Sequence, residues 1–445
     1  MRPQPPKGTR DYFPNEIRAR DRAVATVKRV FESFGYAPLE TPALERLDVL
    51  TGKYGDEADR LIFRILKRGA AGKRGEADLG LRYDLTVPLA RVMAANQDLP
   101  RPFKRYQVQP VWRAERPQRG RFREFIQCDV DCVGTASVLA DAEMVAVMHE
   151  TLAALGLVEY RISINHRKIL SAFMDSLNLP PGVQLADIRE IDKLDKIGID
   201  GVREGLIKGG TAAPAVERII SYIDAGATKY FAAYIENAKS YVGASPAGAD
   251  GINEMEKLAE YLSYFGVPDG VLSFDLHMAR GLDYYTGPIF EAYVSEGGVG
   301  SVAGGGRYDH LIAQLGGPDL PATGTSFGLE RIIALLAERE APAEDGASVD
   351  VLVAVYDESV LEDALKAAAE IRAAGAKCEV YLEPSAKLAK QFGYADAKGI
   401  PYVVVVGPDE VAKGVVQIKD LAQREQKEVP RTGLTSAFRS MLEKD

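Results

Sequence analysis

The chain has 445 residues, of which 46% are hydrophobic, and it carries a formal net charge of −9. That length predicts about three domains with sizeable cores. The acidic balance excludes a protein that coats DNA nonspecifically, but it leaves room for a nucleic acid bound at local basic patches.

Three cysteines are too few for a disulfide framework, and two of them, Cys128 and Cys132, fall on the apolar side of a predicted strand. No apolar run is long enough to cross a membrane, and the first residues do not form a signal peptide. We therefore expect a soluble cytoplasmic protein whose thiols stay reduced.

The first predicted element is a helix that starts near Pro14 and ends at Gly35. Its apolar residues recur at helical spacings: Ile17, Val24, Val27, Phe31 and Phe34. The next segment, 36–45, contains Pro38 and Pro42, which suit an edge strand and argue against a central one.

A strand-like run at 61–67 leads into the basic, glycine-rich segment 68–75, which we interpret as the mobile tip of a hairpin. Asp84 and Thr86 then stand at a corner between a strand and a helix, with Pro88 in the first helical turn. We expect Thr86 to be the N-cap of that helix. The carboxylate and the hydroxyl could also hold the ammonium group of a substrate.

Residues 103–134 predict an antiparallel hairpin with alternating faces. One face is polar and consists of Arg105, Gln107, Gln109, Arg113, Arg121, Arg123, Phe125, Gln127, Asp129 and Asp131. The simple alternative is a solvated face. However, arginines suit phosphate, an aromatic ring suits a stacked base, and carboxylates and amides suit a small polar substrate. The composition therefore favours a ligand site.

Helical spacing at 136–155 and a strand at 160–164 follow the hairpin. From 165 to 265 the apolar positions keep helical spacing, and strand-rich sequence resumes at Val271. We interpret this as a helical module inserted into an antiparallel-sheet domain.

A second polar cluster follows where strand-rich sequence resumes. It consists of Arg280, Asp283, Tyr284 and Tyr285, which are close together in the sequence. A glycine triplet at 304–306 precedes Arg307, Tyr308 and Asp309, and it would let the backbone approach another group closely. Alone, the triplet would predict a turn and the tyrosines a strand edge. Together with the flanking arginines they favour a pocket.

The third cluster is a helix start in which Arg331 points away from the apolar stripe. The stripe consists of Leu329, Ile332, Ile333 and Leu336. Arg331 could simply be solvated. The alternative is that it holds a phosphate together with the helix N-terminus.

Residues 341–348 have the composition of a linker, and a separate α/β domain follows. Its predicted strands are 351–356, 378–383 and 402–407, and its predicted helices are 358–374 and 386–398. Scattered lysines could form a nucleic-acid face or could simply be solvated: Lys387, Lys390, Lys398, Lys413 and Lys419.

Together these segments resemble the histidyl-tRNA synthetase family of class II aminoacyl-tRNA synthetases. The opening helix with ETPAL is similar to motif 1, VWRAERPQRGRFREFIQ to motif 2 and FGLERI to motif 3. LRYDLT resembles the amino-acid-binding loop, and ARGLDYYTG and AGGGRYD resemble the two signature segments. The segments follow the order of the family.

The resemblance implies an α+β catalytic domain of the class II fold (1–164 and 266–340), a helical insertion (165–265) and an α/β anticodon-binding domain (349–445). It implies a homodimer formed through motif 1. It also implies that histidine and ATP form histidyl-adenylate, from which the histidine passes to the 3′ end of tRNA(His). Magnesium would accompany the ATP, and we expect no organic cofactor and no protein-held metal, because the four histidines are dispersed.

The resemblance also implies roles for individual residues. Arg113 and Arg280 would contact the α-phosphate and the carboxylate of the substrate, and Arg331 would hold the γ-phosphate. The ATP-binding set would be Arg113, Arg121, Phe125 and Arg331, with adenine on Phe125. The histidine-binding set would be Asp84, Leu85, Thr86, Gln127, Asp131, Tyr284, Tyr285 and Tyr308. Two alternatives are a catalytically silent regulatory subunit of histidine biosynthesis and a class II synthetase for another amino acid.

Overall fold

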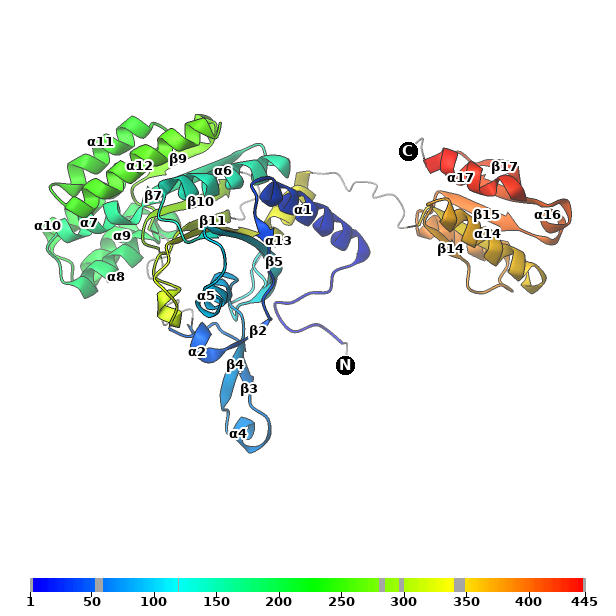
Figure 1. Cartoon of the computed structure of the whole chain (residues 1–445), viewed down its shortest axis with the longest axis horizontal. Coiled ribbons are helices and arrows are strands. Elements are labelled where there is room, and N and C mark those ends of the chain that lie inside the picture. Colours follow the sequence, from blue (N-terminus) through cyan, green and yellow to red (C-terminus); the bar gives the residue numbers. More distant parts are fainter. Residues whose placement is uncertain are drawn as a thin grey trace. The chain divides into compact units, whose positions relative to one another are not determined.

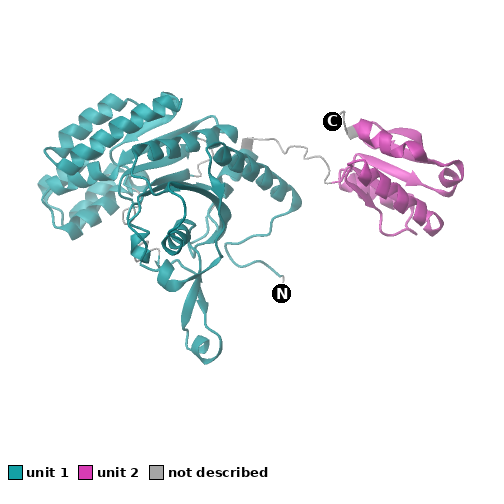
Figure 2. Cartoon of the chain, viewed as in Figure 1, with its two compact units in different colours: residues 1–340 teal, residues 341–445 magenta. Residues whose placement is uncertain are grey.

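The computed structural model describes residues 3–52, 59–118, 120–279, 285–295, 300–339 and 349–442. The chain divides into two compact units, residues 1–340 and 341–445 (Figure 2). No helix within the described ranges combines the length and the apolar character that a membrane-spanning segment needs.

Unit 1 is built on a nine-stranded sheet with the strand order β1-β5-β6-β12-β11-β10-β7-β9-β8 (Figure 1). The strands are β1 Ala37–Pro38, β5 Phe103–Trp112, β6 Glu124–Val133, β7 Tyr160–His166, β8 Ala227–Thr228, β9 Leu272–Asp275, β10 Pro288–Val294, β11 Ser301–Arg307 and β12 Ala322–Gly328. Most neighbours are antiparallel, whereas β1 runs parallel to β5 and β7 runs parallel to β9. The predicted hairpin is confirmed as β5 and β6, and Gln109 pairs with Gln127.

Helices cover the apolar face of this hairpin. They are α1 Pro14–Ser33, α6 Val138–Ala154 and α13 Leu329–Arg339. Tyr106, Cys128, Val130 and Cys132 belong to the same apolar core as residues of these helices. The helix expected to start near Pro14 and the two cysteines expected in the core are thus confirmed, and all three cysteines are free thiols.

The polar face of the hairpin is buried too, on the side of the sheet where α5 Thr86–Ala95 packs. Gln107, Asp129 and Asp131 are each no more than 3% exposed. The simple alternative of a solvated face is therefore wrong for these strand residues, whereas Arg121 near the turn is exposed.

The predicted N-cap of α5 needs correction. Thr86 is not the N-cap: α5 already includes it, and Leu85 occupies the cap position without a side-chain hydrogen bond. The cap is Asp84 instead, because its Oδ1 accepts a hydrogen bond from the Val87 backbone N–H over 3.0 Å. An aspartate can satisfy the first free N–H groups of a helix from just outside it.

The hairpin at 61–82 forms as expected, but its tip is helical. Strands β3 Arg64–Leu66 and β4 Ala77–Leu81 pair in a three-stranded sheet with β2 Leu44–Arg46, and α2 Leu47–Leu50 follows β2. Helix α4 Gly69–Lys73 joins β3 to β4 at the far end of this projection (Figure 1). The periodicity of so short a segment does not distinguish a helical turn from a loop.

The segment between β7 and β9 is helical, as predicted, apart from the short strand β8. Its helices are α7 Arg167–Ser176, α8 Pro181–Ile191, α9 Leu194–Lys208, α10 Ala213–Asp224, α11 Phe231–Val242 and α12 Pro246–Tyr264. Helix α12 packs on α6 and α7. Phe173 and Met255 share one core with sheet residues such as Ile164, so this segment is packed as part of unit 1.

Unit 2 is an α/β structure, as predicted, with the strand order β14-β13-β15-β16-β17. Its elements are β13 Val351–Val355, α14 Leu361–Ala373, β14 Cys378–Val380, α15 Leu388–Ala397, β15 Tyr402–Val406, α16 Pro408–Lys413, β16 Val415–Asp420, β17 Glu425–Pro430 and α17 Leu434–Leu442. Apolar cores lie on both faces of β13 and β15. The strands β16 and β17 were not predicted.

Candidate active site

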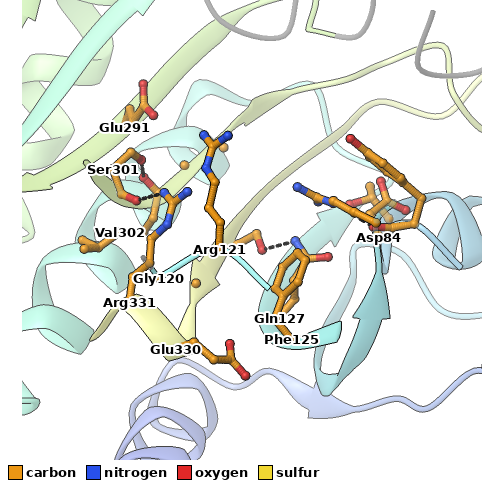
Figure 3. A pocket seen from close by; sticks show the side chains of 18 of the residues that line it. Asp84, Gly120, Arg121, Phe125, Gln127, Glu291, Ser301, Val302, Glu330 and Arg331 are labelled. Carbon is orange, nitrogen blue, oxygen red and sulfur yellow. Dashed lines mark hydrogen bonds between the residues drawn. The ribbon is translucent and has the colours of Figure 1, made fainter. Parts of the chain in front are cut away.

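A cavity of about 590 Å³ opens in unit 1 where the hairpin β5–β6, strands β11 and β12 and the start of α13 meet (Figure 3). Its lining includes most of the residues that the sequence singled out: Asp84, Thr86, Arg113, Arg121, Phe125, Gln127, Tyr285 and Arg331. Segments far apart in the chain therefore meet in one cavity.

Three arginines belong to the lining: Arg113, Arg121 and Arg331. The guanidinium carbon of Arg113 lies 4.4 Å from the ring centroid of Tyr83 and 5.1 Å from that of Phe125, and its Nε donates to the Tyr83 carbonyl over 3.1 Å. Arg331 donates a hydrogen bond from Nη1 to the carbonyl of Ser301. Arg121 lies 3.5 Å from the carboxylate of Glu115. Phosphate groups suit such an array of guanidinium groups.

Hydrogen-bonding side chains also belong to the lining. Gln127 donates from Nε2 to Ser326 Oγ over 2.7 Å, which fixes the orientation of its amide across β6 and β12. Asp84 and Thr86 lie at the start of α5, where the Asp84 carboxylate is already held by the Val87 N–H. These groups could hold the ammonium and carboxylate ends of an amino acid.

Three predicted histidine-binding residues do not line the cavity. Leu85 is fully buried, and its carbonyl accepts a hydrogen bond from Arg105 over 3.2 Å. Asp131 and Tyr308 are 3% and 2% exposed, and the Tyr308 hydroxyl donates to Asp131 Oδ1. This pair forms a buried network beside the described lining, and its direct contact with histidine stays a prediction.

Burial also governs the protonation of this network. It raises the pKa of Asp131, although the neighbouring Arg105 guanidinium opposes the effect. It raises the pKa of Asp129 to about 7, again against Arg105. Tyr285, which does line the cavity, has a raised pKa because it is buried beside these carboxylates. The Tyr285 phenol therefore remains protonated and can donate a hydrogen bond at neutral pH.

The glycines at 304–306 are part of strand β11, so the interpretation as a turn is wrong. A Cβ atom on Gly305 would lie 2.1 Å from the carbonyl oxygen of Gly324. One on Gly306 would lie 3.0 Å from Cδ1 of Tyr285. The close backbone approach predicted from these glycines is thus observed, and it makes room for the lining residue Tyr285.

Comparison with known proteins agrees with this geometry. A sequence model of the family described as "Histidyl-tRNA synthetase" matches residues 8–332, and one described as "Anticodon binding domain" matches residues 350–441. The chain belongs to the histidyl-tRNA synthetase family.

Relatives in this family extend over the whole chain. It is 42% identical over 448 residues to the histidine–tRNA ligase of Gloeobacter violaceus, with 95% of each chain covered. It is 40% identical to that of Cytophaga hutchinsonii, with 96% of this chain and 97% of the relative covered. The crystal structure of histidyl-tRNA synthetase from Nostoc superposes with a TM-score of 0.80 at 32% identity and covers 99% of this chain. The fold is therefore that of a class II aminoacyl-tRNA synthetase.

Two residues that the histidyl-tRNA synthetase resemblance implicated, Arg280 and Tyr284, lie outside the described residues. Their roles remain predictions. Both belong to the segment just before Tyr285, which does line the cavity.

Other lining residues were not predicted, and Glu291 and Glu330 are the most notable. The Glu330 carboxylate accepts a hydrogen bond from the Ile126 backbone N–H over 2.9 Å, and burial raises its pKa. Its position at the start of α13, directly before Arg331, could have indicated from the sequence that it lines the cavity. Glu291 looks in the sequence like any strand residue, and only the pairing of β10 with β11 brings it to the cavity.

Within the described ranges, no group of three or more histidine, cysteine, aspartate or glutamate residues could hold a metal ion by itself. A magnesium ion carried by ATP needs only one or two carboxylates in addition to phosphate oxygens. Glu291 and Glu330 both belong to the lining, but the Glu330 carboxylate is already bound by the Ile126 N–H.

Proposed function

We propose that this chain is a histidine–tRNA ligase that activates histidine with ATP and transfers it to the 3′ end of tRNA(His). The observation that carries the proposal is the joining of Arg113, Arg331, Gln127 and Asp84 in one cavity. It is supported by family membership over the full length of the chain.

The nucleotide would lie along the arginine-rich part of the cavity. Arg113, together with Arg280, would contact the α-phosphate and the substrate carboxylate, and Arg331 would hold the γ-phosphate. Arg121 would contribute to binding the phosphates. Adenine would stack on Phe125, which already packs against a planar guanidinium on Arg113. Mg²⁺ would arrive bound to the phosphates of ATP.

The chemistry needs no nucleophile from the protein. A carboxylate oxygen of histidine attacks the α-phosphorus, the bond to the bridging oxygen breaks, and pyrophosphate leaves. In the second step a hydroxyl of the terminal ribose attacks the carbonyl carbon of the adenylate, and AMP leaves. The arginines contribute by positioning the groups and by stabilising the negative charge that develops.

Histidine would lie on the hydrogen-bonding side of the cavity. Asp84, Thr86 and Gln127 would hold its ammonium and carboxylate ends, and its imidazole would lie against Tyr285 and Tyr284. Asp131 and Tyr308 would complete this imidazole pocket, with the Asp131 carboxylate as the acceptor for an imidazole N–H. A buried acceptor that needs an imidazole N–H is left unpaired by other side chains, and such sites discriminate by roughly 10⁴ to 10⁵.

The remaining parts of the proposal concern partners. Unit 2 would bind the anticodon region of tRNA(His), the protein would form a homodimer through α1 and the segment that follows it, and it would act in the cytoplasm. Light scattering coupled to size-exclusion chromatography tests the dimer.

Charging of tRNA(His) with radiolabelled histidine tests the function itself. We expect ATP-dependent formation of histidyl-tRNA. A folded protein that binds histidine but forms neither adenylate nor histidyl-tRNA would instead favour the regulatory alternative.

A further inference from the structure

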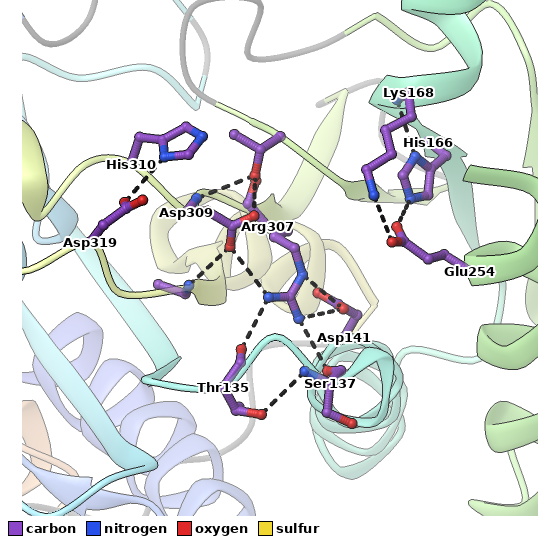
Figure 4. Close-up of polar contacts among 12 residues, drawn as sticks. Thr135, Ser137, Asp141, His166, Lys168, Glu254, Arg307, Asp309, His310 and Asp319 are labelled. Atoms are coloured by element: carbon purple, nitrogen blue, oxygen red, sulfur yellow. Dashed lines mark hydrogen bonds and ion pairs between the residues drawn. The ribbon is translucent and has the colours of Figure 1, made fainter. Parts of the chain in front are cut away.

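Arg307 lies at the end of β11, directly before Tyr308, and its side chain is only 7% exposed (Figure 4). Its guanidinium reaches the first turn of α6, a helix that lies outside all the family motifs. Nε and Nη2 lie 3.0 and 2.6 Å from Oδ2 of Asp141. Nη1 and Nη2 also donate to the carbonyls of Thr135 and Ser137 over 3.1 Å each.

Asp141 is a suitable anchor for this arginine. Its side chain is fully buried, so the Arg307 guanidinium is the ionic partner that offsets its desolvation. Burial raises the pKa of Asp141 to about 6, against the effect of Arg307, so the carboxylate is mostly ionised at neutral pH. A fixed negative charge thus sets where the guanidinium lies.

On its other side Arg307 holds the segment that carries Tyr285. Its backbone carbonyl accepts a hydrogen bond from the Thr286 N–H over 2.8 Å. Its Nη1 lies 3.3 Å from Asp309 Oδ1, while Asp309 Oδ2 accepts from the Thr286 hydroxyl over 2.8 Å. A Cβ atom on Gly287 would lie only 2.9 Å from Cδ of Arg307, so the two segments are in tight contact.

Two tyrosines flank these contacts. Tyr285 is adjacent to Thr286 and lines the cavity. Tyr308 is adjacent to Arg307 and donates its hydroxyl hydrogen bond to Asp131. A shift of the Arg307 guanidinium would therefore move both phenol groups, whereas Arg113 and Phe125 belong to other segments.

We propose that Asp141 is a positioning residue for the histidine pocket, and that it acts through Arg307 on Tyr285 and Tyr308. This inference rests on the proposed function. Asp141 touches neither substrate, so its effect should fall on the binding of histidine and should spare that of ATP.

Asp141→Asn tests this, because it keeps the shape of the side chain and removes its charge. In ATP–pyrophosphate exchange we expect the KM for histidine to rise about tenfold, with the KM for ATP nearly unchanged and the rate restored by saturating histidine. Arg307→Lys keeps a positive charge but loses the planar fork, and it should raise the same KM. The matched control is Asp319→Asn, an exposed partner of His310 that should change neither KM.

A purely structural role would give a different pattern. It would lower the folded fraction and the apparent kcat, with both KM values unchanged, and that result would overturn the inference. A parallel rise in both KM values would overturn it as well.

Asp141→Asn could prevent folding, and Thr286→Val then supplies the test, because it removes the hydrogen bonds of the Thr286 hydroxyl with Asp309 and with the Arg307 carbonyl and leaves Asp141 and the Arg307 side chain in place. It should raise the KM for histidine selectively, and an unchanged KM would refute the inference. Absence of exchange in the unchanged protein would instead refute the proposed function, on which this inference depends.

Discussion

Nη2 of Arg105 lies 2.8 Å from Oδ2 of Asp131, and neither side chain is more than 4% exposed. This ion pair lies behind the lining of the cavity, on the polar face of the hairpin β5–β6. The guanidinium also donates to the carbonyl of Leu85, directly before α5. The pair thus ties the hairpin to the corner that carries Asp84 and Thr86.

Replacing Asp131 by alanine should destabilise unit 1 strongly, because it removes the carboxylate that pairs directly with the buried guanidinium of Arg105. We expect a loss of about 3–5 kcal/mol in the free energy of unfolding. Urea denaturation followed by fluorescence measures it, since the single tryptophan, Trp112, lies in β5 and reports on unit 1. Asp48→Ala removes an exposed ion pair and should change the free energy of unfolding far less. Equal effects of the two changes would contradict this role of the buried pair.

Arg113→Lys should impair adenylation although it keeps the charge. Lysine can neither lie flat between the rings of Tyr83 and Phe125 nor offer a planar fork to phosphate. We expect kcat for ATP–pyrophosphate exchange to fall by about 100-fold. Arg116→Lys, at an exposed position in the same loop, serves as the control and should leave the rate close to that of the unchanged protein. A comparable rate for Arg113→Lys would remove this residue from the mechanism.

Adenylation of histidine should need only unit 1, whereas charging of tRNA(His) should need both units. The cavity lies within unit 1, so a chain that ends before Ser348 should keep most of its histidine-dependent exchange activity. Charging of tRNA(His) should fall much further, because unit 2 would no longer hold the tRNA. Parallel assays of exchange and charging on the shortened chain test this division, and an equal loss in both would refute it.

His166 should contribute a pH dependence to stability. It is fully buried, its Nδ1 accepts the Lys168 backbone N–H, and its Nε2 therefore donates to Glu254 over 2.6 Å (Figure 4). Burial lowers the pKa of His166, so the neutral ring persists below pH 6.5 in the folded protein while the unfolded chain takes up a proton. Burial alone would raise the pKa of Glu254, but hydrogen bonds from His166 and Lys168 bring it to about 2, so it stays ionised.

Because the unfolded state binds more protons, stability should fall as the pH falls through 6.5. Between pH 7.5 and 5.5 we expect this histidine to account for a loss of up to about 1.4 kcal/mol in the free energy of unfolding. Urea denaturation of the unchanged protein and of His166→Gln at pH 7.5 and at pH 5.5 measures this loss. The variant should lose less stability over this interval, and an identical pH dependence would show that His166 titrates alike in both states.

Periodicity in the sequence was sufficient to predict the elements that have one consistent apolar face, such as α1 and the hairpin β5–β6. It could not show how deeply the polar face of the hairpin is buried, because that depends on the pairing of β6 with β12. There Asp131 lies opposite Gly324, where a Cβ atom would come within 2.0 Å of the Asp131 carboxylate. A glycine far along the chain thus makes room for a buried carboxylate.

Asp141 was not predicted near the candidate site, because its contacts also depend on residues far along the chain. Asp141 belongs to a largely apolar helix, and its partner Arg307 is 166 residues away. Nothing local in the sequence distinguishes such an aspartate from an exposed one near a helix start. By contrast, Arg113, Gln127 and Arg331 stood out because each departs from the composition expected of its own face, and all three line the cavity.

The measurement that tests the central claim most directly is ATP–pyrophosphate exchange carried out with each of the twenty amino acids in turn. The cavity, whose lining combines guanidinium, tyrosine and carboxylate groups, should support exchange with histidine and give only background rates with the other nineteen. Exchange with a different amino acid, or no exchange with histidine from a folded protein, would contradict this account.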